Sequence, residues 1–110
     1  MYKNLFRIDE FNDFIKSNSA ALIYYSTPDC NVCKVLKPKT LDFINENFPL
    51  IKPAYVDCEK ATELAAQNSI FTVPAIIIYF EGKEFIRKSR NVNFAQLKVE
   101  LRRPYSLFFD

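Results

Sequence analysis

Two short, unbroken apolar runs constrain the fold of this chain more than any other feature. Ala20–Tyr25 and Ala75–Phe80 contain only apolar residues, which is typical of strands that are covered on both faces. Both runs are far too short to cross a bilayer as helices. A sheet with two covered faces needs helices on each side, so we expect an α/β architecture.

Apolar spacing and capping residues predict the helices around these strands. Asp9 is a candidate N-cap for the first helix, in which Phe11, Phe14 and Ile15 fall on one stripe. The second helix is long and contains Pro38, which should kink it. Its predicted apolar face consists of Val32, Val35, Leu36, Phe43, Ile44 and Phe48. This second helix is predicted to begin at Cys33. The two remaining helices are predicted to span Glu59–Gln67 and to follow Asn93.

The remaining strands are predicted from β-prone segments and turn residues. Leu50–Val56 is a predicted strand, in which Pro53 indicates an irregularity or a sheet edge. Glu81-Gly82 supplies a turn after the second apolar run, and Lys83–Lys88 returns as a hairpin partner. A further short strand is predicted at Asn4–Arg7.

Length and composition indicate one domain. The chain has 110 residues, of which 49% are hydrophobic, enough for a core without disulfide staples. We therefore expect a single three-layer α/β domain over residues 1–110. Residues 104–110 form an apolar C-terminal tail, which either packs back on the domain or contacts another chain.

Charge, cysteine and histidine counts limit the chemistry. The net charge of +2 is too small to indicate nucleic acid as a partner. The absence of histidine excludes a Cys–His nucleophile pair and a His-containing metal site. Three cysteines fit one redox pair and a spare thiol in a reducing compartment better than a secreted disulfide scaffold. Met1–Asp13 lacks the apolar segment of a signal peptide, so we expect a cytoplasmic protein without membrane partners.

The motif Cys30-Asn31-Val32-Cys33 lies between the first apolar run and the long helix. Two thiols at this spacing meet at the first turn of a helix and interconvert between a dithiol and a disulfide. The free N–H groups and the positive end of the helix dipole favour a thiolate there. We expect Cys30 to be exposed and to act as the nucleophile. Cys33, one turn in and more buried, then acts as the resolving thiol.

Two other interpretations of the motif stay open. Half of a zinc site would need two more ligands, and Cys58 is the only other cysteine. An inert pair of buried cysteines is also compatible with the spacing. Pro28, Asp29 and Asn31 argue against that pair, because they are typical of a loop and a helix start.

Beyond the motif, residues at matching separations resemble the thioredoxin family over roughly residues 8–103. These are Leu22–Tyr25, Lys34, Pro38, Val56-Asp57, Val73-Pro74, Phe80 and Gly82. The resemblance implies a thioredoxin fold, a three-layer α/β/α sandwich with a central mixed sheet. It also implies that Pro74 is cis and packs beside the two cysteines, and that Val73 with Pro74 binds an extended substrate segment. The exposed apolar surface of the site would come from Pro28, Val32, Val73 and Pro74.

The implied function is that of a thiol-disulfide oxidoreductase that reduces protein disulfides by dithiol exchange through Cys30 and Cys33. Its substrates would be disulfide-bearing proteins, and its electrons would come from an upstream thioredoxin-reductase-type flavoprotein. No bound cofactor and no metal are implied, and we expect a monomer.

The chain departs from the family pattern at four places. Asp29 replaces a Trp, Asn31-Val32 replaces Gly-Pro, Tyr24 replaces a buried Asp and Arg90 replaces a Gly. Without the buried carboxylate, we expect slow resolution of a mixed disulfide. These losses favour the alternatives of a non-catalytic binding or adaptor module or a redox sensor, whereas the retained cysteines and Pro74 favour the enzyme.

Two further predictions concern Cys58 and a basic stretch near the end of the chain. Cys58 is most simply a partly buried small thiol, with a regulatory thiol as the alternative. Lys83, Arg87, Lys88 and Arg90 are predicted to form a solvated hairpin face, with a patch for an acidic partner as the alternative.

Overall fold

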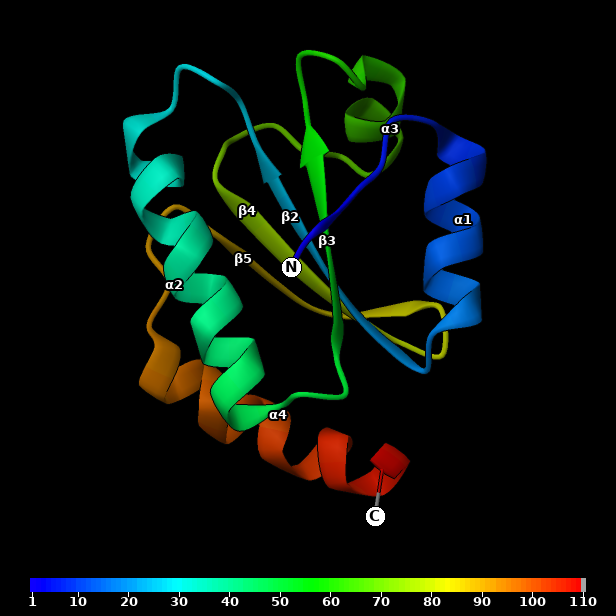
Figure 1. Cartoon of the computed structure of the whole chain (residues 1–110), viewed down its shortest axis with the longest axis vertical. Coiled ribbons are helices and arrows are strands. Elements are labelled where there is room, and N and C mark those ends of the chain that lie inside the picture. Colours follow the sequence, from blue (N-terminus) through cyan, green and yellow to red (C-terminus); the bar gives the residue numbers. More distant parts are fainter. Residues whose placement is uncertain (110) are drawn as a thin grey trace.

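A mixed sheet of five strands forms the middle layer of the structure, a computed structural model that describes residues 1–109 (Figure 1). The strands are Lys3–Asn4 (β1), Ala20–Ser26 (β2), Lys52–Asp57 (β3), Ala75–Phe80 (β4) and Lys83–Ser89 (β5). The helices are Ile8–Ser17 (α1), Asn31–Asn47 (α2), Thr62–Gln67 (α3) and Phe94–Phe109 (α4). The strand order is β1-β3-β2-β4-β5, in which β1, β3 and β2 run parallel and the β2–β4 and β4–β5 pairs are antiparallel.

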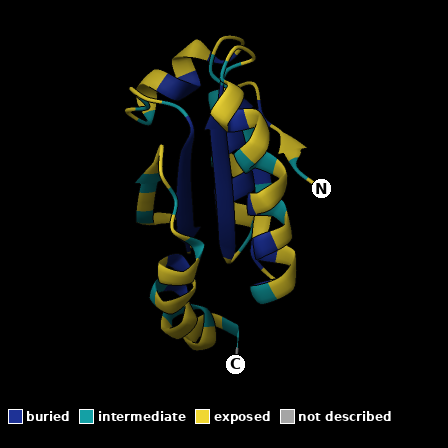
Figure 2. Cartoon of the chain, turned by 90° about the vertical axis from the view of Figure 1, so that its left-hand side faces the viewer, coloured by how far each residue is buried: buried dark blue, intermediate teal, exposed yellow. Residues whose placement is uncertain are grey.

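Helices cover both faces of this sheet. Phe11 and Phe14 of α1 and Leu64 of α3 belong to the core cluster on one face. Ile44 of α2 and Leu97 of α4 belong to the cluster on the other. Figure 2 shows the buried strands enclosed by helices whose outer surfaces are exposed. The predicted three-layer α/β/α sandwich with a central mixed sheet is confirmed. No helix within residues 1–109 is long and apolar enough to span a membrane.

Both apolar runs form central strands that are buried on both faces, as predicted. Successive side chains of a strand point to opposite faces. In β2, Ile23 joins the cluster under α1 and α3, and Tyr24 joins the cluster under α2 and α4. In β4, Ile77 and Ile78 divide in the same way. Each run therefore supplies apolar side chains to both layers of the core.

The predicted starts of α1 and α2 were wrong. α1 begins at Ile8 with Arg7 as its N-cap, so Asp9 lies in the first turn, where its carboxylate pairs with Arg7 at 3.0 Å. α2 begins at Asn31, two residues before the predicted start, because the sulfur of Cys30 caps its first turn. At α1 the Glu10 carboxylate accepts the backbone N–H of Arg7, and at α2 the Cys30 sulfur accepts that of Cys33. Such side-chain hydrogen bonds set helix boundaries, and apolar spacing carries no information about them.

Part of the predicted apolar face of α2 was also wrong. Phe43 and Ile44 are buried as predicted, but Val35 is 58% exposed. Val32 is 60% exposed, which agrees with the exposed apolar surface that the family resemblance implies. Thr40 is buried instead. The first turns of α2 therefore present two valines to the surface, next to the cysteine pair.

The N-terminal strand is shorter than predicted. β1 covers Lys3–Asn4, whereas the prediction was Asn4–Arg7. The Glu10 carboxylate accepts the backbone N–H groups of Phe6 and Arg7, both at 3.0 Å. These amides are therefore used to start α1 and do not extend the strand.

Two further predictions concern the segment from β3 to α3. Pro53 lies beside β2, and β1 pairs only with the two residues that follow it. On the side that faces β1, Pro53 is therefore unpaired within the described strands and lies at a sheet edge, as predicted. α3 begins at Thr62, later than the predicted Glu59–Gln67, because the preceding residues form a turn closed on Asp57.

The predicted C-terminal tail continues α4 and packs on the domain. The ring of Tyr105 lies 5.0 Å from that of Phe48, measured between centroids. Phe108 stacks on Phe80 with centroids 5.1 Å apart. Of the two predictions for the tail, packing on the domain is the one observed, while Asp110 lies outside the described residues.

The β4–β5 turn places a non-glycine residue in the left-handed region. Glu81 and Gly82 have φ of 53° and 76°, and Asn-Gly is the pair that suits such a two-residue turn best. Glu81→Asn is therefore expected to raise the free energy of unfolding by about 0.5–1 kcal/mol. Chemical denaturation measures this change. Lys83→Asn, in the extended part of the hairpin, should give no gain, and a less stable Glu81→Asn variant would contradict the turn geometry.

Candidate active site

A disulfide joins Cys30 and Cys33 at the N-terminus of α2. Cys30 is the N-cap residue, and its sulfur accepts the backbone N–H of Cys33 at 3.1 Å. Its own N–H donates to the carbonyl oxygen of Thr27 at 3.2 Å. Cys30 is partly exposed, whereas Cys33 is only 2% exposed. The accessible sulfur therefore lies at the positive end of a helix dipole, which favours a thiolate once the pair is reduced.

Tyr24 of β2 contacts the backbone of the cysteine pair. Its side chain is buried, and its hydroxyl donates a hydrogen bond to the carbonyl oxygen of Cys33 at 2.7 Å. Burial, with a smaller contribution from Tyr55, raises the pKa of Tyr24 above its ordinary value. Tyr24 is therefore a neutral donor at physiological pH. It holds the first turn of α2, and it does not replace the missing carboxylate as a base.

A cluster that the sequence analysis missed holds α2 on the sheet. The rings of Tyr24 and Tyr55 stack with centroids 6.2 Å apart. The Lys37 ammonium lies 3.6 Å from the centroid of the Tyr55 ring, a cation–π contact of about 0.5–1 kcal/mol. The Tyr2 hydroxyl donates to the carbonyl oxygen of Lys37 at 2.8 Å. These residues come from separate segments, so no local sequence pattern connects them.

Val73 and Pro74 lie at the same end of the sheet as the cysteine pair. Ala75 at the start of β4 pairs with Tyr25 near the end of β2, so the segments before β4 and after β2 meet there (Figure 1). The Val73–Pro74 bond is cis, as the family resemblance implies. Val73 is partly buried and Pro74 is buried, so the expectation of an exposed Pro74 was wrong. The carbonyl oxygen of Pro74 accepts the N–H of Arg90 at 2.9 Å.

A groove of about 400 Å³ lies between the first turns of α2 and the segment after β5. It is lined by Val32, Val35, Leu36, Lys39, Arg90, Asn91 and Val92. The exposed Val32 and Val35 form its apolar side. Arg90 has φ of 63°, a conformation that glycine adopts more easily. The replacement of the family glycine by Arg90 thus adds a positive charge to the groove in a strained backbone position.

Cys58, the third cysteine, is partly buried. Burial, followed by the charge of Asp57, raises the pKa of the Cys58 thiol to about 11. A protonated thiol is a poor nucleophile, so Cys58 should not compete with the cysteine pair. Within residues 1–109, no three His, Cys, Asp or Glu side chains are grouped in a way that could hold a metal ion.

Alkylation tests this assignment for Cys58. At pH 8 the folded protein is expected to be alkylated at Cys58 about a hundredfold more slowly than the chain unfolded in urea. The reason is that a pKa of about 11 leaves little thiolate at pH 8. The rate should rise as the pH approaches 11. Mass spectrometry of the Cys58 peptide gives both rates, and equal rates in the folded and unfolded chains would contradict the raised pKa.

Comparisons with known proteins agree with this geometry. The family model described as Thioredoxin matches residues 4–103. The chain is 38% identical over 96 residues to the thioredoxin-like protein YdfQ of Bacillus subtilis, in a match that covers 87% of this chain and 85% of that protein. Mitochondrial thioredoxin 3 of Saccharomyces cerevisiae, in its oxidized form, superposes with a TM-score of 0.82 at 19% identity and covers 93% of this chain and 94% of its own. Thioredoxin from Trypanosoma brucei brucei gives 0.83 at 20% identity, with 96% and 92% covered.

The fold and the cysteine pair together define a thiol-disulfide oxidoreductase. The chain belongs to the thioredoxin family, because the family model spans most of its length and a curated relative shares more than a third of the aligned residues. The family resemblance and the thioredoxin fold predicted from the sequence are therefore confirmed.

Proposed function

We propose that this protein reduces protein disulfides, with Cys30 as the nucleophile and Cys33 as the resolving thiol. The observation that carries the proposal is the Cys30–Cys33 disulfide at the N-terminus of α2. Cys30 is the accessible sulfur of the pair, and Cys33 is almost fully buried. A protein-sized substrate can therefore reach only Cys30 for the first attack.

The exchange proceeds in two steps and needs no bound cofactor. The Cys30 thiolate attacks one sulfur of a substrate disulfide, forms a mixed disulfide and expels the other substrate sulfur as a thiolate. The Cys33 thiol loses its proton to solvent and attacks the Cys30 sulfur. This step forms the Cys30–Cys33 disulfide and expels the second substrate thiolate. Two electrons pass to the substrate, and the expelled thiolates take up protons from solvent.

Val73 and Pro74 are the proposed docking edge for an extended segment of the substrate. Pro74 has no N–H to donate within the sheet, and both residues lie at the end of the sheet that carries the cysteine pair. The nearby groove offers the apolar side chains of Val32 and Val35. A disulfide-bearing protein segment with apolar residues near its cysteine suits this surface.

The oxidised pair has to be reduced again before each new cycle. We assign this step to a thioredoxin-reductase-type flavoprotein, which supplies two electrons per turnover to the Cys30–Cys33 disulfide. A monomer acting in the cytoplasm fits this role, since the exchange requires one chain and a reducing compartment.

Trapping of the mixed disulfide tests the proposal. Cys33→Ser, incubated with a protein that contains an accessible disulfide, is expected to accumulate a covalent complex that disappears on addition of dithiothreitol. Cys30→Ser should form no such complex, and Cys58→Ser should turn over like the wild type. Non-covalent association without any covalent complex would contradict the reductase and support the adaptor module instead.

A further inference from the structure

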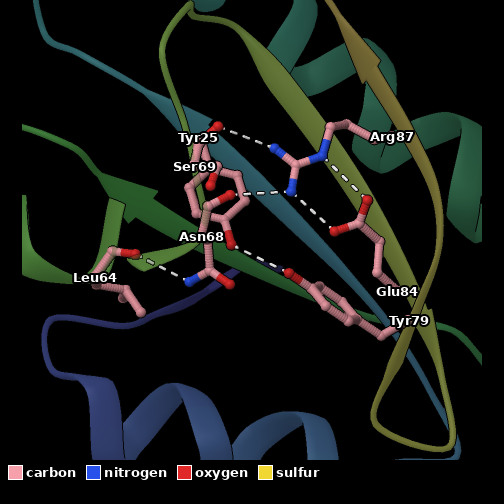
Figure 3. A network of polar contacts seen from close by, with 7 residues as sticks. All are labelled: Tyr25, Leu64, Asn68, Ser69, Tyr79, Glu84 and Arg87. Carbon is pink, nitrogen blue, oxygen red and sulfur yellow. Dashed lines mark hydrogen bonds and ion pairs between the residues drawn. The ribbon is translucent and has the colours of Figure 1, made fainter. Parts of the chain in front are cut away.

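The loop of residues 68–74, called the docking loop here, connects α3 to the proposed docking edge. It begins with a tight reversal in which Ser69 has φ of 56°. The N–H groups of Asn68, Ser69 and Ile70 are used by the last turn of α3, where they donate to carbonyl oxygens of Leu64, Ala66 and Ala65. The carbonyl oxygens of Asn68 and Ser69 face away from α3, toward β5 (Figure 3).

Arg87 of β5 binds both of these carbonyl groups. Its Nη1 donates to the carbonyl oxygen of Ser69 at 3.1 Å, and its Nη2 donates to that of Asn68 at 2.9 Å. Ser69 and Asn68 are separated from Arg87 by 18 and 19 positions in the sequence, respectively. One guanidinium group therefore connects the start of the docking loop to the β4–β5 hairpin (Figure 3).

Glu84 holds the guanidinium in this orientation. Its carboxylate accepts from Arg87 Nε at 3.1 Å and from Nη2 at 2.8 Å. Such a two-point pair fixes the plane of a guanidinium group, which a lysine ammonium cannot reproduce. The Arg87 side chain is 34% exposed in this pair. Arg87 is exposed, as predicted for the solvated hairpin face, but its donors are directed at the loop and at Glu84.

Besides Arg87, the docking loop is supported by Ile70, which is partly buried against the core under α1 and α3. A hollow of about 200 Å³ lies between the loop and β5, lined by Ser69–Thr72, Ala75, Arg87 and Ser89. At the far end of the loop, the carbonyl oxygen of Pro74 accepts the N–H of Arg90. Phe71 and Thr72, between the two attachments, are exposed. The loop thus spans a hollow. Its first residues are bound by Arg87 of β5, and its last residue, Pro74, is bound by Arg90, which follows β5.

We propose that Arg87 is a positioning residue that fixes the docking loop and thereby sets the affinity for protein substrates. The inference rests on the proposed function, because it assumes that Val73 and Pro74 bind the substrate. A loop released from Arg87 can move into the hollow and carry Val73 out of register with an extended substrate segment. A small disulfide that makes no contact with the loop is not affected by this movement.

The kinetic test compares Arg87→Gln with Lys83→Gln, which removes a positive charge from the same strand without touching the loop. For a protein disulfide, Arg87→Gln is expected to raise KM about tenfold and to leave kcat within about twofold. Reaction of the reduced enzyme with a small aromatic disulfide should change by less than about twofold. Lys83→Gln should match the wild type in both assays, and Arg87→Lys should resemble Arg87→Gln.

Hydrogen exchange provides a readout that does not depend on activity. The amides of Ser69 and Ile70 are expected to exchange roughly tenfold faster in Arg87→Gln than in the wild type, with exchange in β2 and β4 unchanged. If the wild type reduces no protein disulfide, the proposed function fails, and the exchange data still decide whether Arg87 holds the loop. Unchanged exchange and unchanged KM would overturn the inference. An equal loss in all assays, with faster exchange throughout the sheet, would show a structural role only and would also overturn it.

Discussion

Replacement of Cys30 by serine is expected to reduce disulfide exchange to the uncatalysed rate, a loss of roughly a thousandfold or more. Cys30 is the accessible sulfur of the pair, and it lies at the helix N-terminus that favours a thiolate. A serine hydroxyl at the same position stays protonated at neutral pH and cannot form a mixed disulfide. Steady-state reduction of a protein disulfide by dithiothreitol, followed with and without the variant, measures the loss.

Cys58→Ser is the matched control for this experiment. It removes a thiol of the same size whose pKa is raised to about 11 by burial, so it should retain at least about half of the wild-type rate. Substantial activity in Cys30→Ser would show that another group carries the exchange. A large loss in Cys58→Ser would show that this third thiol takes part in the reaction.

Tyr24→Asp is expected to speed the second step of the exchange, the attack of Cys33 on the mixed disulfide, by about tenfold or more. In the wild type the buried Tyr24 hydroxyl is a donor to the Cys33 backbone and has a raised pKa, so it accepts no proton. A carboxylate at this position would supply a base next to the resolving thiol. Single-turnover mixing with a small aromatic disulfide separates the two steps, because only the first depends on substrate concentration.

Tyr24→Asn separates the effect of the base from that of the cavity. Both substitutions remove a buried aromatic ring that stacks on Tyr55, and both should lower the free energy of unfolding by about 3–5 kcal/mol. Only the Asp variant can accept a proton, so its advantage over Asn should grow with pH as the carboxyl ionises. Equal second-step rates in the wild type and the two variants would contradict the view that a missing base limits resolution.

Much of the fold could be predicted because its strongest signals are local in the sequence. The two apolar runs predict β2 and β4, and Glu81-Gly82 predicts the turn of the hairpin. The element boundaries could not be predicted in the same way, because side chains such as that of Glu10 set them by binding particular backbone amides. Apolar periodicity also cannot separate a core face from an exposed apolar surface, so it placed the exposed Val35 on the same face as the buried Phe43 and Ile44.

In the candidate site, too, local spacing predicts one part, and contacts between distant segments form the part that it does not predict. Cys30 and Cys33 are one helical turn apart, so their meeting at the helix start follows from spacing alone. The contacts of Lys37 with Tyr55 and of Arg87 with the docking loop join segments that are distant in the sequence. Such contacts depend on the order and register of strands in the sheet, and no short motif specifies them.

An equilibrium redox titration of the Cys30–Cys33 pair tests the reductase most directly. The protein is equilibrated in buffers of known potential, and differential alkylation with mass spectrometry gives the fraction of reduced pair. A reductase of protein disulfides is expected to have a midpoint near about −270 mV, the value of thioredoxin. A midpoint near about −120 mV, that of a strong periplasmic oxidant, would contradict the proposed direction of electron flow. A pair that forms no disulfide across the range would contradict the enzyme altogether.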